Sequence, residues 1–203
     1  MSEICELSDN FKKMFTIIDS NKYVKECISN KSKDIHSLSY IIDRQLSQSD
    51  CIKLGIGLEK IILDIILSNN PLLTNIKEKN IKNIKEKDHL FVDNNKKIIY
   101  YAELKSNLNL DTEKSKTTTY KCNIILEELI LKYPDYKIEM YLVGNRYFDK
   151  KIIPKIILNK YLDIKDNIVG MNDYINHLCD KSLFENEEEY KLFLNYLANK
   201  MFS

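Results

Sequence analysis

The chain has 203 residues, of which 44% are hydrophobic and 30% are charged, and its formal net charge is +1. With only four glycines and three prolines there is no linker-like segment, so we expect a single domain over 1–203. Every apolar run ends well short of the roughly 20 residues that a membrane span needs. The N-terminus lacks the basic and apolar blocks of a secretory signal, and the five cysteines are scattered without a CxxC pair. We therefore expect a cytoplasmic protein with free thiols and no membrane partner.

The first part of the chain, about 1–70, is predicted to be helical. Apolar residues recur at helical spacing in three groups. These are Phe11, Met14, Phe15 and Ile18, then Leu38, Ile41, Ile42 and Leu46, and then Leu58, Ile61, Ile62, Ile65 and Ile66. The third group belongs to a helix that we expect to be capped within 47–50 and to end at Asn69-Asn70-Pro71.

A hairpin is predicted next, from two runs rich in β-branched and aromatic residues at 90–92 and 98–102, with a turn-like Asp93-Asn94-Asn95-Lys96 between them. If Asn94 and Asn95 form the turn, Asp88 lies opposite Tyr101. Side chains alternate along a strand, so Tyr101, Glu103 and Lys105 share one face, and Asp88 projects on that same face.

A further helix is expected from about Ser115 to Lys132, where Tyr133-Pro134-Asp135 stops it. A buried strand over 137–143 and a loop at 144–147 follow. The tail, about 149–203, is predicted to be helical, closing with Tyr190, Phe193, Leu194 and Leu197 on one face.

Two carboxylates and one ammonium carry the most specific chemical signal in this order of elements. Hard cations such as Mg²⁺ take oxygen ligands, usually one or two carboxylates together with substrate phosphate, and Asp88 and Glu103 could supply them. Lys105, beside Glu103 on the same face, could hold an attacking water or stabilise charge on a phosphate. In a chain this rich in charge, Glu-x-Lys is also common as a solvated strand face.

The passage that carries this triplet resembles type II restriction endonucleases, which belong to the PD-(D/E)XK nuclease superfamily. The likeness rests on three segments within about 55–147: 88–92, Tyr100-Tyr101-Ala102-Glu103-Leu104-Lys105, and Asn107 with Leu110-Asp111-Thr112-Glu113-Lys114. One departure is that Lys87, not proline, precedes Asp88.

This resemblance implies an α/β (α+β) fold with a restriction-endonuclease-like core, in which helices flank a central mixed β-sheet, and with additional N- and C-terminal helices. It implies Asp88 and Glu103 as ligands of Mg²⁺, or of Mn²⁺ in its place, and Lys105 as the catalytic lysine. Glu59, on the helix before the first core strand, would be a third acidic member of the site. A solvated position on that helix is an equally good interpretation of Glu59.

Double-stranded DNA is the expected substrate, and a homodimer is the simplest form that cuts both strands. The expected DNA-facing residues lie after each core strand: Asn107, Asn109, Lys114, Lys116, Thr118, Asn145 and Arg146. Lysines cluster before the hairpin at 77, 79, 82, 85 and 87, which permits phosphate binding. The bias of the whole chain toward Lys, Asn and Ile accounts for the cluster equally well.

Two alternatives stay open at this point. One is a repair or junction nuclease with the same core, and the other is a non-catalytic DNA- or protein-binding domain. Other enzyme classes lack support, because the chain has no GxxxxGK[ST] loop, no GxSxG elbow and no HExxH helix.

Overall fold

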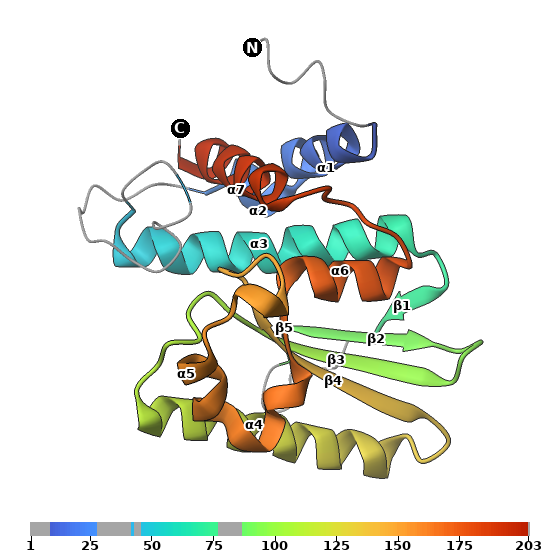
Figure 1. The fold of residues 1–203 in the computed structure, drawn as a ribbon. Coiled ribbons are helices and arrows are strands. Elements are labelled where there is room, and N and C mark those ends of the chain that lie inside the picture. The colour runs from blue at the N-terminus through green and yellow to red at the C-terminus, as the bar shows by residue number, and fades with distance from the viewer. Residues whose placement is uncertain (1–8, 28–41, 43–45, 77–86, 203) are drawn as a thin grey trace. The chain divides into compact units, whose positions relative to one another are not determined.

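The computed structural model describes residues 9–27, 42, 46–76 and 87–202. The chain divides into two compact units (Figure 1). One unit takes Met1–Ser68 together with Ile175–Ser203, and the other takes Asn69–Tyr174. The predicted N- and C-terminal helical parts thus fall mainly in the first unit, and the strands fall in the second.

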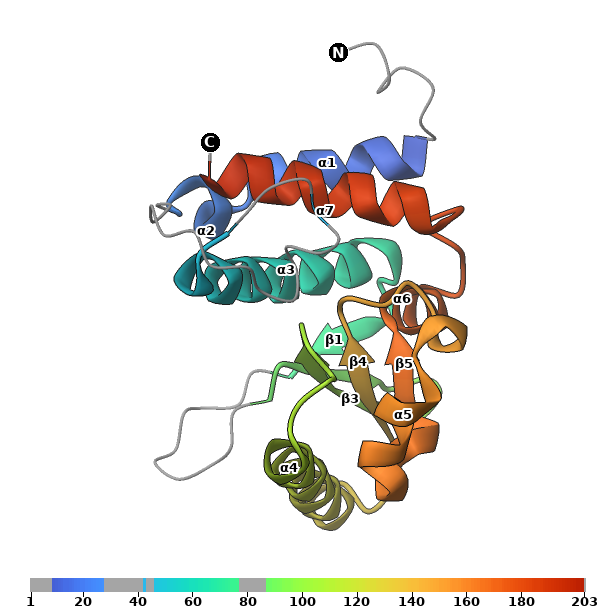
Figure 2. The same cartoon turned by 60° about the vertical axis from the view of Figure 1, so that its left-hand side comes forward.

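The first unit is helical, as expected for the start and the end of the chain. Its helices are α1 (Asp9–Ser20), α2 (Lys22–Lys25), most of α3 (Gln48–Asn69), the second half of α6 (Met171–Cys179) and α7 (Glu187–Phe202). Figure 2 shows α7 running alongside α1, where the Phe15 and Tyr196 rings stack at 4.2 Å and Lys200 Nζ lies 2.9 Å from Asp19 Oδ1.

The predicted apolar faces of α1, α3 and α7 are buried. Ser47 caps α3, because its Oγ accepts the backbone N–H of Asp50 at 2.9 Å. The helix expected around 38–46 lies mostly outside the described residues, as do lysines 77, 79, 82 and 85; Ile42 and Leu46 are described and buried.

The second unit is an α+β unit built on a five-stranded mixed sheet. Its strands are β1 (Leu73–Asn75), β2 (His89–Asp93), β3 (Ile98–Lys105), β4 (Lys137–Gly144) and β5 (Ile168–Gly170), in the order β1-β2-β3-β4-β5. The first three strands are antiparallel neighbours, and β3, β4 and β5 run parallel. The carboxyl ends of β3, β4 and β5 therefore meet at one edge of the sheet.

The hairpin forms where it was predicted, but its register differs by two residues. Leu90, not Asp88, pairs with Tyr101. The turn takes four residues because Asp93 Oδ1 accepts the backbone N–H groups of Asn95 and Lys96, both at 2.9 Å, and because Lys97 adopts a positive φ of 56°. A shift of two residues keeps every side chain on its predicted face.

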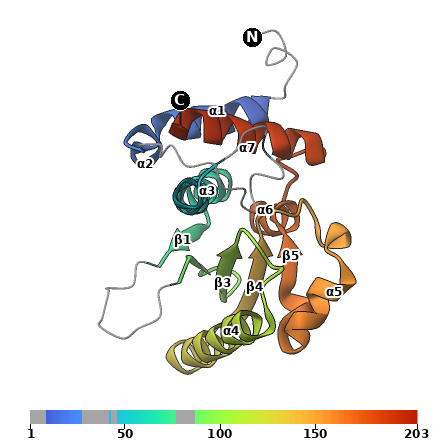
Figure 3. The same cartoon turned by 90° about the vertical axis from the view of Figure 1, so that its left-hand side faces the viewer.

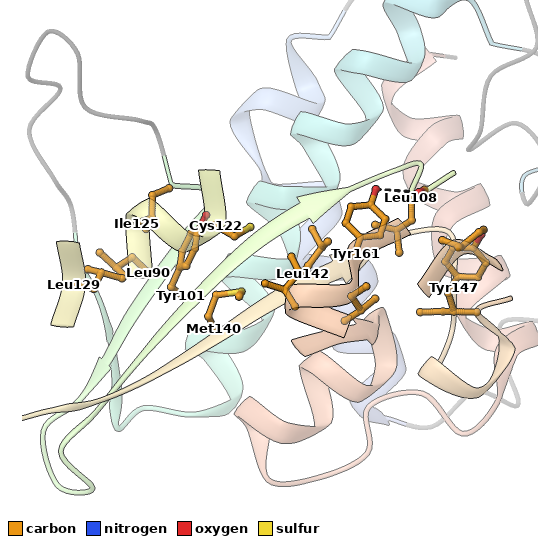
Figure 4. Close-up of a cluster of buried hydrophobic side chains, with 14 of the residues drawn as sticks. Leu90, Tyr101, Leu108, Cys122, Ile125, Leu129, Met140, Leu142, Tyr147 and Tyr161 are labelled. Atoms are coloured by element: carbon orange, nitrogen blue, oxygen red, sulfur yellow. Dashed lines mark hydrogen bonds between the residues drawn. The ribbon is translucent and has the colours of Figure 1, made fainter. Parts of the chain in front are cut away.

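Helix α4 (Thr112–Lys132) covers one face of the sheet, as the views along the strands show (Figure 3). It begins three residues earlier than predicted, because Asp111 Oδ1 accepts the backbone N–H of Lys114 at 2.8 Å and caps it. The buried cluster between them combines Leu90, Ile99, Tyr101, Met140 and Leu142 of the sheet with Cys122, Ile125 and Leu129 of α4 (Figure 4).

The helical prediction for the whole tail is wrong in one place. After the 3₁₀ turn η3 (Lys150–Ile152), α5 (Lys155–Leu158) and the 3₁₀ segment η4 (Asn159–Asn167), the chain forms β5. Ile168 and Val169 are β-branched and pair with Leu142 and Val143 of β4. Gly170 ends this strand against the backbone of Asp149, at a distance that leaves no room for a Cβ.

Among the helices that the structure describes, none combines the length and the apolar character needed to cross a bilayer.

Candidate active site

The candidate site lies at the carboxyl end of β3, on the face that α4 covers. Alternation along β3 directs Tyr101, Glu103 and Lys105 toward α4. Glu103 is completely buried there, with a relative exposure of 0%. A carboxylate that is fully removed from water needs counter-charges or hydrogen bonds.

Three side chains provide these partners. Lys105 Nζ lies 2.7 Å from Glu103 Oε1, and Lys121 Nζ of α4 lies 2.6 Å from Oε2. The Tyr101 hydroxyl donates to Oε2 at 3.3 Å. Each oxygen of Glu103 is thus held by one ammonium group.

Asp88 directly precedes β2 and is half-buried. Continuing the observed register by one pair places it opposite Glu103. Its Oδ2 accepts the backbone N–H of Leu104 at 2.7 Å, which fixes the carboxylate at the end of β3. The structure therefore brings Asp88, Glu103 and Lys105 together, as predicted from the sequence, although the hairpin register differs from the predicted one.

Asp88 lies close enough to Glu103 for the negative charges of the two carboxylates to repel each other. Burial and the negative charge of Glu103 raise the pKa of Asp88 from 3.8 to about 6, against the opposing effects of the Leu104 N–H, Lys105 and Lys121. Added positive charge beside Asp88 would therefore stabilise its ionised form.

The charge of Glu103 favours the charged form of Lys105, whereas it disfavours the charged form of Asp88. Burial alone would lower the lysine pKa, but the charge of Glu103 and the hydrogen bond to it outweigh burial, so the pKa of Lys105 is raised. Lys105 therefore stays protonated near neutral pH, which suits a fixed positive charge better than a general base.

Lys121 was not among the predicted site residues. Its position on α4 contains a usable signal, because Thr118, Lys121, Cys122 and Ile125 follow one another at spacings that put them on the sheet-facing side of the helix. The sequence could show that this lysine shares the apolar face of α4, but not that Glu103 is the partner it meets.

The donor set fits a hard divalent cation, since Asp88 and Glu103 offer only oxygen atoms. Within the described ranges no group of three or more His, Cys, Asp or Glu side chains is placed to hold a metal. Glu59 lies half-buried on α3, in the other unit, and its role at the site stays a prediction.

The predicted DNA-facing residues divide into exposed and buried groups. Lys114, Lys116 and Asn109 are exposed, and Asn107 and Arg146 are half-buried. The other two are buried. Thr118 is 8% exposed and its hydroxyl donates to the Lys114 carbonyl at 3.0 Å, while Asn145, directly after β4, is 2% exposed. The role of these residues toward DNA stays a prediction.

A hollow of about 590 Å³ opens beside the site, and we call it the Lys105 hollow. Lys105 forms one wall, and residues of the α4 N-terminus form the others. They are Leu110, Asp111, Glu113, Lys114, Thr117 and Thr118. The charge of Asp111 is offset by Lys114, whose Nζ lies 3.2 Å from its Oδ2. The hollow gives an external molecule a route to the ammonium group of Lys105.

Comparisons of the chain with protein-family models, with curated proteins and with solved structures each found no match.

Proposed function

We propose that the chain is a Mg²⁺-dependent endonuclease of the type II restriction kind, which hydrolyses phosphodiester bonds in double-stranded DNA with a restriction-endonuclease-like core. The observation that carries this proposal is the meeting of Asp88, Glu103 and Lys105 at one end of β3. Lys105 Nζ lies 2.7 Å from Glu103 Oε1, and Asp88 Oδ2 accepts the backbone N–H of Leu104, the residue between them.

Each residue would have a separate task in the hydrolysis. Asp88 and Glu103 would hold the cation, which supplies positive charge to the scissile phosphate and makes water a stronger acid. Lys105, kept protonated by Glu103, would donate to a non-bridging phosphate oxygen or orient the attacking water. Water would add to phosphorus and release one proton to solvent, the bond to one ester oxygen would break, and that oxygen would leave as a hydroxyl after taking one proton from solvent.

The Lys105 hollow supports this assignment, because it lets a DNA backbone approach the lysine from the α4 side. Lys114 lines it with a second ammonium group, which is suited to phosphate oxygens, beside the carboxylates of Asp111 and Glu113. Cutting both strands of a symmetric DNA site would most simply use a homodimer, so we include a second copy of the chain in the proposal.

One observation favours a non-catalytic DNA-binding domain as the second candidate. Lys105 and Lys121 occupy both oxygens of Glu103, an arrangement that a purely structural buried ion pair would also show. A repair or junction nuclease with the same core is distinguished by its products, which would be nicks or smears in place of discrete fragments.

Plasmid digestion tests these candidates directly. We expect discrete fragments with Mg²⁺, and their loss with a chelator, with Lys105→Ala or with Glu103→Ala, while DNA binding persists. Lys137→Ala is the matched control, because Lys137 also pairs with a glutamate two residues away, Glu139, at 2.6 Å, but on the exposed part of β4. Cleavage that survives Lys105→Ala, or an absence of any effect of Mg²⁺ on DNA in the wild type, would reject the nuclease.

A further inference from the structure

A second pocket lies on another side of α4, against η4. It has a volume of about 540 Å³, and we call it the Tyr120 pocket. Its α4 wall includes Lys116, Tyr120 and Asn123, which recur at helical spacing. The Lys105 hollow instead uses Lys114, Thr117 and Thr118, so the two cavities flank the first turns of the same helix. Figure 2 shows α4 and the segment after α5 side by side.

The lining combines large apolar faces with cations. Tyr120 is 63% exposed and Leu162 is 65% exposed, and both border the pocket. Lys116 and Lys160 contribute two positive charges against the single negative charge of Asp163. Exposed aromatic surface beside ammonium groups is the combination that binds nucleic-acid bases by stacking and their phosphates by charge.

Lys160 is oriented by two hydrogen bonds, which makes it a fixed part of the pocket. Its Nζ donates to Asn109 Oδ1 and to the Leu110 carbonyl, both at 2.7 Å. These acceptors lie on the loop that leads from Lys105 to α4. Lys160 therefore connects the lining of the Tyr120 pocket to the loop that follows β3.

The volume of about 540 Å³ lies within the ordinary range of about 300–1,000 Å³ for small-molecule pockets, so the pocket has room for one nucleotide. The amide of Asn123 adds a donor and an acceptor that can pair with a base edge. One nucleotide has the apolar face, the anionic group and the hydrogen-bonding edge that these residues complement.

We propose that the Tyr120 pocket binds one unpaired nucleotide of DNA, with its base against Tyr120 and its phosphate between Lys116 and Lys160. This inference rests on the proposed action on DNA and adds a second contact across α4 from the scissile phosphate.

The test uses the full chain and short single-stranded oligonucleotides of mixed sequence that contain one 2-aminopurine. Binding is measured in chelator, so that cleavage does not interfere. We expect the fluorescence of 2-aminopurine to fall on binding as the base stacks. Tyr120→Ala should remove this change and weaken binding by roughly 5- to 150-fold, as expected for the loss of one stacked base. Lys116→Ala should reduce the slope of log affinity against log salt by about one.

Leu131→Ala is the matched control, since Leu131 is an exposed apolar residue of α4 outside the pocket. Equal binding and equal fluorescence for Tyr120→Ala, Leu131→Ala and the wild type would overturn the inference, as would an absence of oligonucleotide binding. Plasmid cleavage distinguishes this outcome from failure of the proposed function. If plasmid is cleaved and Tyr120→Ala has no effect, the proposed nuclease is supported and the nucleotide pocket is rejected. If Tyr120-dependent binding occurs without any cleavage, the nucleotide pocket is supported and the nuclease is rejected.

Discussion

Replacing Asp88 with asparagine is expected to stabilise the fold and to remove the proposed nuclease activity. The pKa of this carboxyl rises from 3.8 to about 6 on folding, mainly through burial and then through repulsion by Glu103. At about 1.4 kcal/mol per pKa unit, the ionised form costs at most about 3 kcal/mol of stability. The amide of the introduced asparagine would keep an oxygen for the backbone N–H of Leu104, so the substitution removes the charge and retains the hydrogen bond.

The pH dependence fixes the sign of this effect. Between pH 4 and about 6 the folded protein holds the Asp88 proton more tightly than the unfolded chain does, so stability due to this group falls as pH rises through that interval. Below pH 4 the two proteins should be alike, and above about pH 6 the variant should be more stable by up to about 3 kcal/mol.

Urea unfolding of both proteins in chelator, at several pH values between 4 and 8, measures this difference directly. The difference between the two proteins isolates Asp88 from the other titrating groups. Added Mg²⁺ should then stabilise the wild type at pH 8 and leave the variant largely unaffected. A variant that is less stable than the wild type at pH 8, or a difference that does not change with pH, would show that Asp88 is not held in a repulsive environment.

Two further substitutions probe other parts of the sheet unit. Lys121→Met leaves one oxygen of Glu103 without its ammonium partner, so Mg²⁺ should stabilise the variant at lower concentration than the wild type in a thermal-shift titration; an unchanged titration would mean that Lys121 does not compete for that oxygen. Gly170→Ala would bring a Cβ within 2.4 Å of the Asp149 backbone, so we expect a loss of about 3 kcal/mol by urea unfolding. Gly144→Ala, whose Cβ would meet only side chains, should lose less, and equal losses would contradict this reasoning.

The elements with strong periodicity were predictable from the sequence. The helix that became α4, the buried strand β4 and the two strands of the hairpin form where apolar spacing indicated them. The shared face of Tyr101, Glu103 and Lys105 followed from strand alternation alone, and the contacts among these three residues agree with it. Local patterns therefore supplied most of what is needed to bring the triplet together.

The features that the sequence did not predict depend on turn geometry or on contacts between distant segments. Strands β1 and β5 have three residues each, too few to show an alternating pattern. The hairpin register depends on Asp93, whose side chain binds two turn N–H groups, a choice that the Asn94-Asn95 pair does not reveal. Lys121 meets Glu103 across 18 positions of sequence, and only the packing of α4 on the sheet makes that pair.

The buried charges at the end of β3 stabilise the sheet poorly, because removing charged groups from water costs free energy. Lys105 and Lys121 each bind Glu103, with side-chain exposures of 34% and 24%, and the Tyr101 hydroxyl is buried against the same carboxylate. Replacing a buried ion pair with apolar residues of similar size is often neutral or stabilising, whereas removing one partner is costly. A cluster that exists for stability and one that exists for chemistry should therefore respond differently to complete replacement.

We expect the combined variant Tyr101→Phe, Glu103→Leu, Lys105→Met and Lys121→Met to be at least as stable as the wild type by urea unfolding. Glu103→Leu alone should lose about 2–3 kcal/mol, because two ammonium groups and one hydroxyl then lose their acceptor and only the lysines can turn toward water. Such a result would mean that the charges are retained at a cost to stability, which is characteristic of active sites. If the combined variant were instead less stable than Glu103→Leu alone, the cluster would be a structural ion-pair network and the second candidate, a non-catalytic domain, would gain support.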